Sequence, residues 1–251
     1  MFKDFTDPNR AEQDGWRGYV VDQGWAGFNA EEHETWDILY QRQTKLLEGR
    51  IVSPFFDGLA ALGLGEGGIP ELMGLNRRLH PLTGWRCVAV AGLVPDAAFF
   101  AMLAQRVFPI GNFIRSRAQL DYLEEPDCFH DIYGHVPMLA HRGLADAMAR
   151  FAAEGCRAIA AGRGDAVARL YWHTVEFGLA REEGELRILG AGLASSFGEA
   201  AKSLEDPGIE RRRFTVEAAA ATPYRHDAMQ PLYLVADSLD EAVEALATAA
   251  L

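Results

Sequence analysis

The sequence is short of the features that mark membrane, secreted and nucleic-acid-binding proteins. Its longest apolar stretch, 88–104, is interrupted by Pro95 and Asp96, which argues against a membrane span. Residues 1–16 contain no apolar segment of the kind found in secretory signals. The net charge of −12, from 24 basic and 36 acidic residues, argues against nucleic acid or an anionic membrane as a partner.

Cysteine is also scarce. The three cysteines, Cys87, Cys128 and Cys156, are odd in number and have no C-x-x-C spacing. This pattern favours reduced thiols over a disulfide framework, and reduced thiols are typical of the cytoplasm. We therefore expect a cytoplasmic protein.

What is present indicates a globular domain. The 251 residues are 49% hydrophobic and 24% charged, which suits one domain with a sizeable core. Helical periodicity dominates, so we expect a mainly α fold with small β elements, a single domain over 1–251 and a flexible lead at 1–13. The spacing predicts helices over 29–48, 96–107, 144–162 and 165–181, a capping box from Ser196 to Glu199, and strands at 86–92, 187–189, 214–218 and 232–237.

The segment "EPDCFHDIYGHVPML", 125–139, places His130 and His135 five residues apart. Residues five apart do not share a face of a regular helix. Two arrangements could still aim both imidazoles at one point. A short helix capped by Asp127 could end at Gly134 and Pro137, which would free His135, or a π-bulge could bring positions i and i+5 together.

A carboxylate completes the pattern. "LYWHTVEFGLA", 170–180, is strongly apolar and contains one acid, Glu176, whose burial costs several kcal/mol unless it is protonated, paired or bound to a metal. Two histidines and one carboxylate match the facial triad of non-haem Fe(II) oxygenases. A structural ion pair for Glu176, within a non-catalytic helical module, is the alternative that the residues leave open.

Other metal enzymes fit less well. The sequence has no H-E-x-x-H motif of zinc hydrolases, and it lacks the paired E-x-x-H motifs of di-iron bundles. The order His, His, Glu on helical segments also differs from the usual order in 2-oxoglutarate oxygenases.

Four motifs in order resemble the pterin-dependent aromatic amino acid hydroxylases, with the short bacterial phenylalanine 4-hydroxylases nearest. Besides the two segments above, they are "GAGLASSFGE" at 190–199 and "MQPLYLVADS" at 229–238. The resemblance runs from about residue 14 to the C-terminus and implies a single catalytic domain without a regulatory or tetramerisation segment. It implies hydroxylation of L-phenylalanine to L-tyrosine by O₂, Fe(II) and a tetrahydropterin, in a monomer. A relative acting on tryptophan or at another ring position is the alternative.

The resemblance also implies roles for individual residues. His130, His135 and Glu176 match the family's iron ligands. On the substrate side, Arg115 matches the arginine that grips the amino acid's carboxylate, for which a guanidinium is well suited, and Ser195 matches a serine that supports the first iron histidine.

Further positions match the two binding pockets. Trp172 would wall the aromatic pocket, and Val235 matches a position near the substrate ring. The pterin-binding segment corresponds to 91–100 and Asp131, with a stacking ring and backbone hydrogen bonds supplied by Gly92, Leu93, Val94 and Phe99. Two departures stand out: His173 replaces Phe or Tyr, where it could act near the iron, and Leu123 replaces a threonine.

Overall fold

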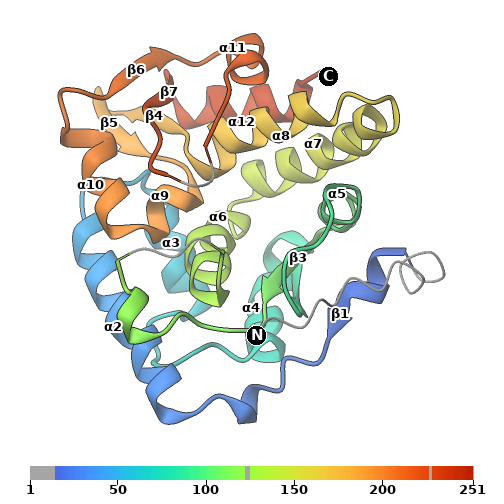
Figure 1. Ribbon diagram of the computed structural model, residues 1–251, viewed down its shortest axis with the longest axis vertical. Coiled ribbons are helices and arrows are strands. Elements are labelled where there is room, and N and C mark those ends of the chain that lie inside the picture. The colour runs from blue at the N-terminus through green and yellow to red at the C-terminus, as the bar shows by residue number, and fades with distance from the viewer. Residues whose placement is uncertain (1–14, 122–124, 226–227, 251) are drawn as a thin grey trace.

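The computed structural model describes residues 15–121, 125–225 and 228–250, and Figure 1 shows their arrangement. The proposed lead at 1–13 and the departure at Leu123 lie outside these residues. The helices are η1 (Gly15–Tyr19), η2 (Trp25–Gly27), α2 (Ala30–Leu47), α3 (Pro54–Leu62), α4 (Leu72–Thr83), α5 (Asp96–Ala104), η3 (Arg117–Gln119), η4 (His130–His135), α6 (Val136–Leu139), α7 (Arg142–Ala160), α8 (Gly164–Tyr171), η5 (Trp172–Glu176), α9 (Ala191–Ser195), α10 (Phe197–Glu205), α11 (Val216–Ala221) and α12 (Leu239–Thr248).

Two small sheets accompany the helices. One has the strand order β1-β2-β3, with β1 (Val20–Val21) antiparallel to β2 (Arg86–Val90) and β3 (Val107–Gly111) parallel to β2. The other has the order β5-β4-β7-β6, formed by β4 (Leu179–Glu182), β5 (Glu185–Ile188), β6 (Glu210–Arg213) and β7 (Leu232–Ala236). The expected fold class, mainly α with small β elements, is confirmed.

Helix α2 forms where the sequence predicts it. The Asn29 side chain accepts a hydrogen bond from the backbone N–H of Glu32, and the Glu32 carboxylate accepts one from the N–H of Asn29. This reciprocal capping box satisfies two N–H groups that the first turn would otherwise leave unpaired. Trp36, Leu39 and Leu47 then turn inward and are buried in the core.

The core joins helices from both ends of the chain around the central η4–α6 segment, which Figure 1 shows in green near the middle of the molecule. Phe129, directly before this segment, and Tyr133 within it are fully buried, and their rings stack with centroids 4.8 Å apart. The two histidines flanking Tyr133 are therefore carried by one of the most enclosed parts of the fold. Among the described residues, no helix combines the length and apolar character needed to span a bilayer.

Three boundaries differ from the sequence expectations. The helix predicted over 96–107 ends at Ala104, and 107–111 forms β3, where Pro109 is tolerated because β3 is an edge strand. The strand predicted at 214–218 lies earlier, as the charged edge strand β6, and α11 begins at Val216 after the cap Thr215. The helix predicted over 165–181 is α8 followed by the π-helical turn η5, and β4 begins at Leu179.

Candidate metal centre and its two cavities

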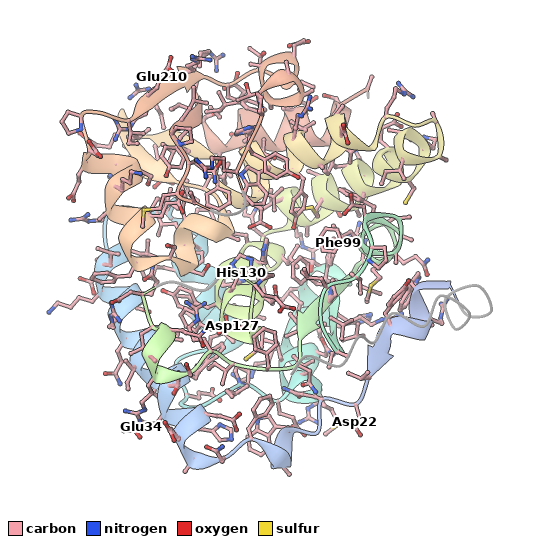
Figure 2. All side chains as sticks on the ribbon, viewed as in Figure 1. Asp22, Glu34, Phe99, Asp127, His130 and Glu210 are labelled. Atoms are coloured by element: carbon pink, nitrogen blue, oxygen red, sulfur yellow. The ribbon has the colours of Figure 1, made fainter. Side chains whose placement is uncertain are left out.

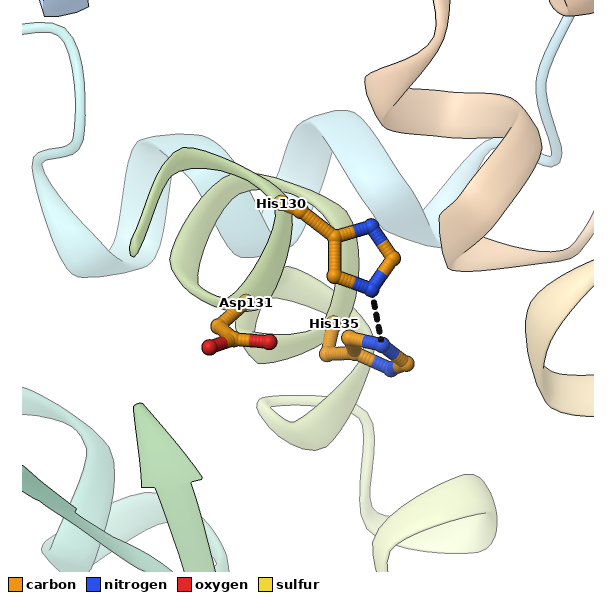
Figure 3. Close-up of side chains that lie close together, drawn as sticks. All are labelled: His130, Asp131 and His135. Atoms are coloured by element: carbon orange, nitrogen blue, oxygen red, sulfur yellow. Dashed lines mark hydrogen bonds between the residues drawn. The ribbon is translucent and has the colours of Figure 1, made fainter. Parts of the chain in front are cut away.

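The two histidines share a π-helical turn. The segment His130–His135 is π-helical, and the Nε2 atoms of its two end residues lie 3.2 Å apart (Figure 3). Of the two arrangements open from sequence, the π-bulge is correct. The chain does not leave the helix at Gly134, because Pro137 sits in the first turn of α6, where its missing N–H costs no hydrogen bond.

Asp127 anchors the start of this turn. Its Oδ1 accepts a hydrogen bond of 3.0 Å from the backbone N–H of His130. The same carboxylate binds Arg115 through Nε and one terminal nitrogen, each at 2.8 Å, and both side chains are buried. The ion pair outweighs the effect of burial and holds the pKa of Asp127 below its usual range.

Glu176 reaches the same point from a second π-helical turn, Trp172–Glu176. Its Oε1 lies 3.1 Å from Nε2 of His135, and its Oε2 lies 3.6 Å from Nε2 of His130. Burial alone would raise the pKa of this carboxyl, but the facing imidazoles lower it, so Glu176 is ionised. Three side chains from two separate turns thus present one oxygen-donor group and two nitrogen donors to one point.

Ser195 fixes the tautomer of His130. Its Oγ lies 2.8 Å from Nδ1 of His130 and 2.9 Å from the Ala191 carbonyl oxygen. A hydroxyl has one proton to donate, and the carbonyl can only accept, so the hydroxyl receives its other bond from Nδ1–H. Nε2 of His130 is then unprotonated, and burial also lowers the pKa of His130 to about 4. A neutral imidazole with its lone pair inward is the form that binds a metal.

These donors fit a metal ion. Two ligands at neighbouring positions of one transition-metal ion lie about 3 Å apart, which matches the donor separations in this cluster. Asp131 is also close, since its carboxylate and the two histidines can be grouped within 4.8 Å. It accepts a 2.7 Å hydrogen bond from the N–H of Gly111, however, and Figure 3 shows it to one side of the two rings. Glu176 is therefore the better third ligand.

Two open cavities meet at this cluster, and His130 and Glu176 line both. The first, called the charged cavity, has a volume of about 200 Å³ and is lined by Arg115, Asp121, Glu125, Pro126, His130, Trp172, Glu176, Phe177, Gly192, Ser195, Ser196, Glu199, Arg225 and Ala228. The second, called the aromatic cavity, has a volume of about 120 Å³ and is lined by Val90, Gly92, Leu93, Val94, Phe99, Phe108, Pro109, Gly111, Pro126, His130, Asp131, His135, Tyr171 and Glu176.

The predicted site residues divide between these cavities. The charged cavity receives Arg115, Trp172 and Ser195, and the aromatic cavity receives the four named residues of the predicted pterin segment together with Asp131. Figure 2 shows Phe99, Asp127 and His130 in the middle of the molecule. Val235 is the exception, because it is buried in β7, pairs with Leu179 of β4 and lines neither cavity.

His173 faces away from the metal ligands. Its Nε2 lies 3.0 Å from the Thr222 carbonyl oxygen, and the ring is buried. This imidazole is therefore hydrogen-bonded to the C-terminal end of α11. In the same turn, Trp172 stacks on Phe177 and Tyr224, with ring centroids 4.8 and 4.3 Å away.

Sequence reasoning missed two acids. Asp127 was expected only as a helix cap, although its place beside Cys128 and Phe129 in an apolar stretch could have signalled a buried partner for an arginine. Glu199 was expected as the far member of a capping box. In the structure Ser196 makes no side-chain cap hydrogen bond, and Glu199 lines the charged cavity.

Close backbone contacts hold the two ligand turns together. A Cβ added to Gly134 would lie 2.8 Å from the Ala191 carbonyl oxygen, and one added to Gly190 would lie 2.2 Å from that of Glu176. Both distances are shorter than atoms tolerate, so only glycine allows η4, η5 and the start of α9 to approach this closely.

Comparison with known proteins gives a consistent result. Residues 24–250 match the family model described as biopterin-dependent aromatic amino acid hydroxylase. The chain is 49% identical over 221 residues to a phenylalanine-4-hydroxylase of Caulobacter vibrioides, covering 88% of this chain and 75% of the relative. It is 37% identical over 227 residues to the tyrosine 3-monooxygenase of Rattus norvegicus, covering 87% of this chain and 44% of the relative.

A solved structure also matches. The crystal structure of Chromobacterium violaceum phenylalanine hydroxylase with bound oxidised Fe(III) superposes with a TM-score of 0.88 at 42% identity. The match covers 91% of this chain and 83% of that chain.

Proposed function

Because the chain belongs to the biopterin-dependent aromatic amino acid hydroxylase family, we propose that it hydroxylates L-phenylalanine to L-tyrosine, using O₂, Fe(II) and a tetrahydropterin. The observation that carries the proposal is the convergence of His130, His135 and Glu176 at the junction of two cavities. Each of the two cavities would hold one of the two organic reactants, the amino acid or the pterin.

His130, His135 and Glu176 would hold the iron, which together with the reduced pterin activates O₂. Ser195 keeps the Nε2 lone pair of His130 directed inward through its bond to Nδ1. The two-histidine, one-carboxylate set leaves other coordination positions open for reactants. The chain's contribution is thus to fix the ligands before either reactant binds.

The charged cavity would hold the amino acid. Asp127 binds Nε and one terminal nitrogen of Arg115, and this pair does not use the other terminal nitrogen, Nη1. A guanidinium held rigidly in this way is suited to a carboxylate. Trp172, supported by its stack on Phe177 and Tyr224, supplies a flat apolar wall for the ring and excludes water from it.

The aromatic cavity would hold the pterin. Phe99 would stack on the pterin ring, and its edge-to-face contacts with Phe100, Phe108 and Tyr171 hold it in place. Gly92, Leu93 and Val94 would supply backbone hydrogen bonds, and Asp131 would face the pterin from the opposite wall.

Phenylalanine should be preferred over tyrosine and tryptophan. A phenol hydroxyl placed against the apolar side chains of Trp172 and Phe177 would be left unpaired, and an unpaired buried hydroxyl costs about 1–3 kcal/mol. The larger indole of tryptophan would overpack a rigid wall at a cost of about 1–3 kcal/mol. Because Val235 lines neither cavity, its predicted role near the substrate ring receives no support from its position.

The test is a competition assay. The protein is incubated with Fe(II), tetrahydropterin, O₂ and equal concentrations of Phe, Tyr and Trp, and the products are identified by mass and retention. Conversion of phenylalanine mainly to 4-hydroxyphenylalanine is expected. Tryptophan hydroxylation, a different ring position or dopa as the main product would overturn the substrate assignment, and no turnover with any of the three would favour a binding module.

We also propose that the protein acts as a monomer in the cytoplasm. Cys87, Cys128 and Cys156 are all free thiols, in keeping with a reducing compartment. Sedimentation at micromolar concentration tests the monomer, and a dimer mass would contradict it.

A further inference from the structure

Glu199 is turned into the molecule instead of capping its helix. It lies in the first turn of α10 and is 7% exposed. Its Oε1 accepts hydrogen bonds of 2.8 Å from both the backbone N–H of Gln230 and the hydroxyl of Tyr233. These two bonds give the carboxylate a fixed orientation on the wall of the charged cavity.

Both of these donors bind Oε1, so the second carboxylate oxygen, Oε2, keeps its capacity to accept a further hydrogen bond. Burial raises the pKa of Glu199, and the two donors on Oε1 together with the charge of Lys202 offset this effect only in part. A buried acid without a cation is costly, and a cation brought to Oε2 would relieve that cost. The cavity therefore presents an oriented acid with one oxygen available to a positively charged group of a ligand.

The other acids of this cavity have other partners or positions. Glu176 faces the two histidines, and Asp121 is largely exposed and paired with Arg42 at 2.5 Å. Glu125 also lines the charged cavity but is only half-buried, and its Oε1 would be 3.6 Å from a Cβ at Gly92. Glu199 remains as the buried carboxylate that could receive a positively charged group of a ligand.

We infer that Glu199 binds the ammonium group of the amino acid substrate, opposite the carboxylate site at Arg115. The inference rests on the proposed function, since a zwitterionic ligand must place both of its charges when it enters a partly buried cavity. Arg115 and Glu199 line the same cavity as Trp172, so one molecule can present its carboxylate, its ammonium and its ring to separate parts of one wall.

The test compares two ligands that differ by the ammonium group alone. Binding of L-phenylalanine and of 3-phenylpropionate is measured by calorimetry on Fe(II)-loaded protein without O₂, for the wild type and Glu199→Gln. A charge-assisted hydrogen bond contributes about 1.5–3 kcal/mol, so the dissociation constant for L-phenylalanine should rise about ten- to a hundredfold. The constant for 3-phenylpropionate should stay within about twofold.

Two matched controls distinguish direct binding of the ammonium group by Glu199 from an indirect structural effect of the substitution. Tyr233→Phe removes one donor to Oε1 but keeps the charge, so it should change both ligands by a similar factor. Glu205→Gln makes the same substitution on α10 outside the cavity, where Glu205 pairs with Arg50, and should change neither. If Glu199→Gln weakens both ligands equally, or neither, the inference is wrong.

Should Glu199→Gln not fold, Glu199→Asp carries the same comparison, because it withdraws the carboxylate by one methylene. It must then weaken L-phenylalanine more than 3-phenylpropionate, and equal effects would overturn the inference. The wild-type turnover assay distinguishes a failure of the proposed function from a failure of the role inferred for Glu199. Absence of turnover contradicts the proposed function, whereas normal turnover without the ligand difference contradicts the role of Glu199 alone.

Discussion

The charged cavity and the aromatic cavity share His130 and Glu176, two of the proposed metal ligands, but differ in the groups that surround them. In the charged cavity the specific groups are side-chain charges fixed by buried partners, as Asp127 fixes Arg115 and Tyr233 fixes Glu199. In the aromatic cavity they are rings and backbone, with Phe99 held edge-on by Phe100, Phe108 and Tyr171.

The difference matches the reactants of the proposed reaction. A zwitterion needs two opposite charges at fixed positions, whereas a flat heterocycle needs a stacking surface and hydrogen-bonding groups in its plane. Besides the shared Glu176, the aromatic cavity is lined by one acid, the half-buried Asp131, and desolvation raises its pKa to about 7 despite the hydrogen bond from Gly111. The two sides of the metal centre thus select their ligands by different interactions.

Removing one of the proposed metal ligands should have the largest effect, because the metal centre lies where the two cavities meet. His135→Ala or Glu176→Ala should abolish stoichiometric Fe(II) binding while the fold is largely kept, because two of the three donors cannot complete the set. Metal analysis and the absorbance of the Fe(II)–nitric oxide adduct measure this. Serving as control, His173→Phe leaves the three donors untouched and should bind iron like the wild type. Wild-type iron binding and turnover in both ligand variants would refute the assignment.

A substitution that affects the charged cavity alone should have the next largest effect. Arg115→Leu removes the carboxylate site and leaves Asp127 buried without its partner. We expect the Michaelis constant for the amino acid to rise about ten- to a hundredfold, and the free energy of unfolding to fall by about 3–5 kcal/mol. Steady-state kinetics and urea unfolding measure these two quantities. A changed pterin constant with an unchanged amino acid constant would move Arg115 out of this role.

A substitution in the aromatic cavity should change the Michaelis constant for the pterin and leave that for the amino acid unchanged. Phe99→Leu keeps an apolar side chain but removes the stacking ring, which is worth about 0.5–1.5 kcal/mol. The Michaelis constant for the pterin should rise about two- to tenfold, and that for the amino acid should stay constant. Phe100→Leu, in the same cluster but outside the cavity lining, is the matched control. Equal effects of the two substitutions on the pterin constant would argue against stacking by Phe99.

The smallest expected effect is a pH dependence of stability. Since the pKa of Asp127 is lower in the folded protein than in the unfolded chain, the pair with Arg115 contributes its full stabilisation above about pH 4. This contribution is lost as the pH falls further, through the folded pKa. The difference in unfolding free energy between the wild type and Asp127→Asn should therefore shrink from pH 7 to pH 3. A difference that stays constant over this range would contradict the lowered pKa.

The convergence of His130, His135 and Glu176 could be predicted from the sequence because its signal is chemical. Two histidines and a glutamate in apolar surroundings need a common partner wherever the chain places them. The spacing of five between His130 and His135 was compatible with two backbone arrangements, and only the structure shows the π-helical one. Helical periodicity could not locate the second π-helical turn either, so the helix predicted over 165–181 extended into β4.

The partners of the charged groups could not be predicted in the same way. Asp127 and Glu199 each follow a common capping pattern, and local sequence explains both without any distant contact. Their actual partners come from other segments, such as Tyr233, which lies 34 residues from Glu199. Strands β3 and β6 were misplaced because edge strands accept proline and charge that central strands exclude.

The glycine contacts between the ligand turns have a consequence for how this centre can be altered. Gly134 and Gly190 let the peptide backbones of η4, α9 and η5 touch, so there is no side-chain layer between them that could deform. The ligand positions are therefore coupled to the backbone path itself. An engineer who wants a different metal or a different donor can exchange the ligating side chains, but a single added methyl group at either glycine would misalign every ligand set placed on this scaffold.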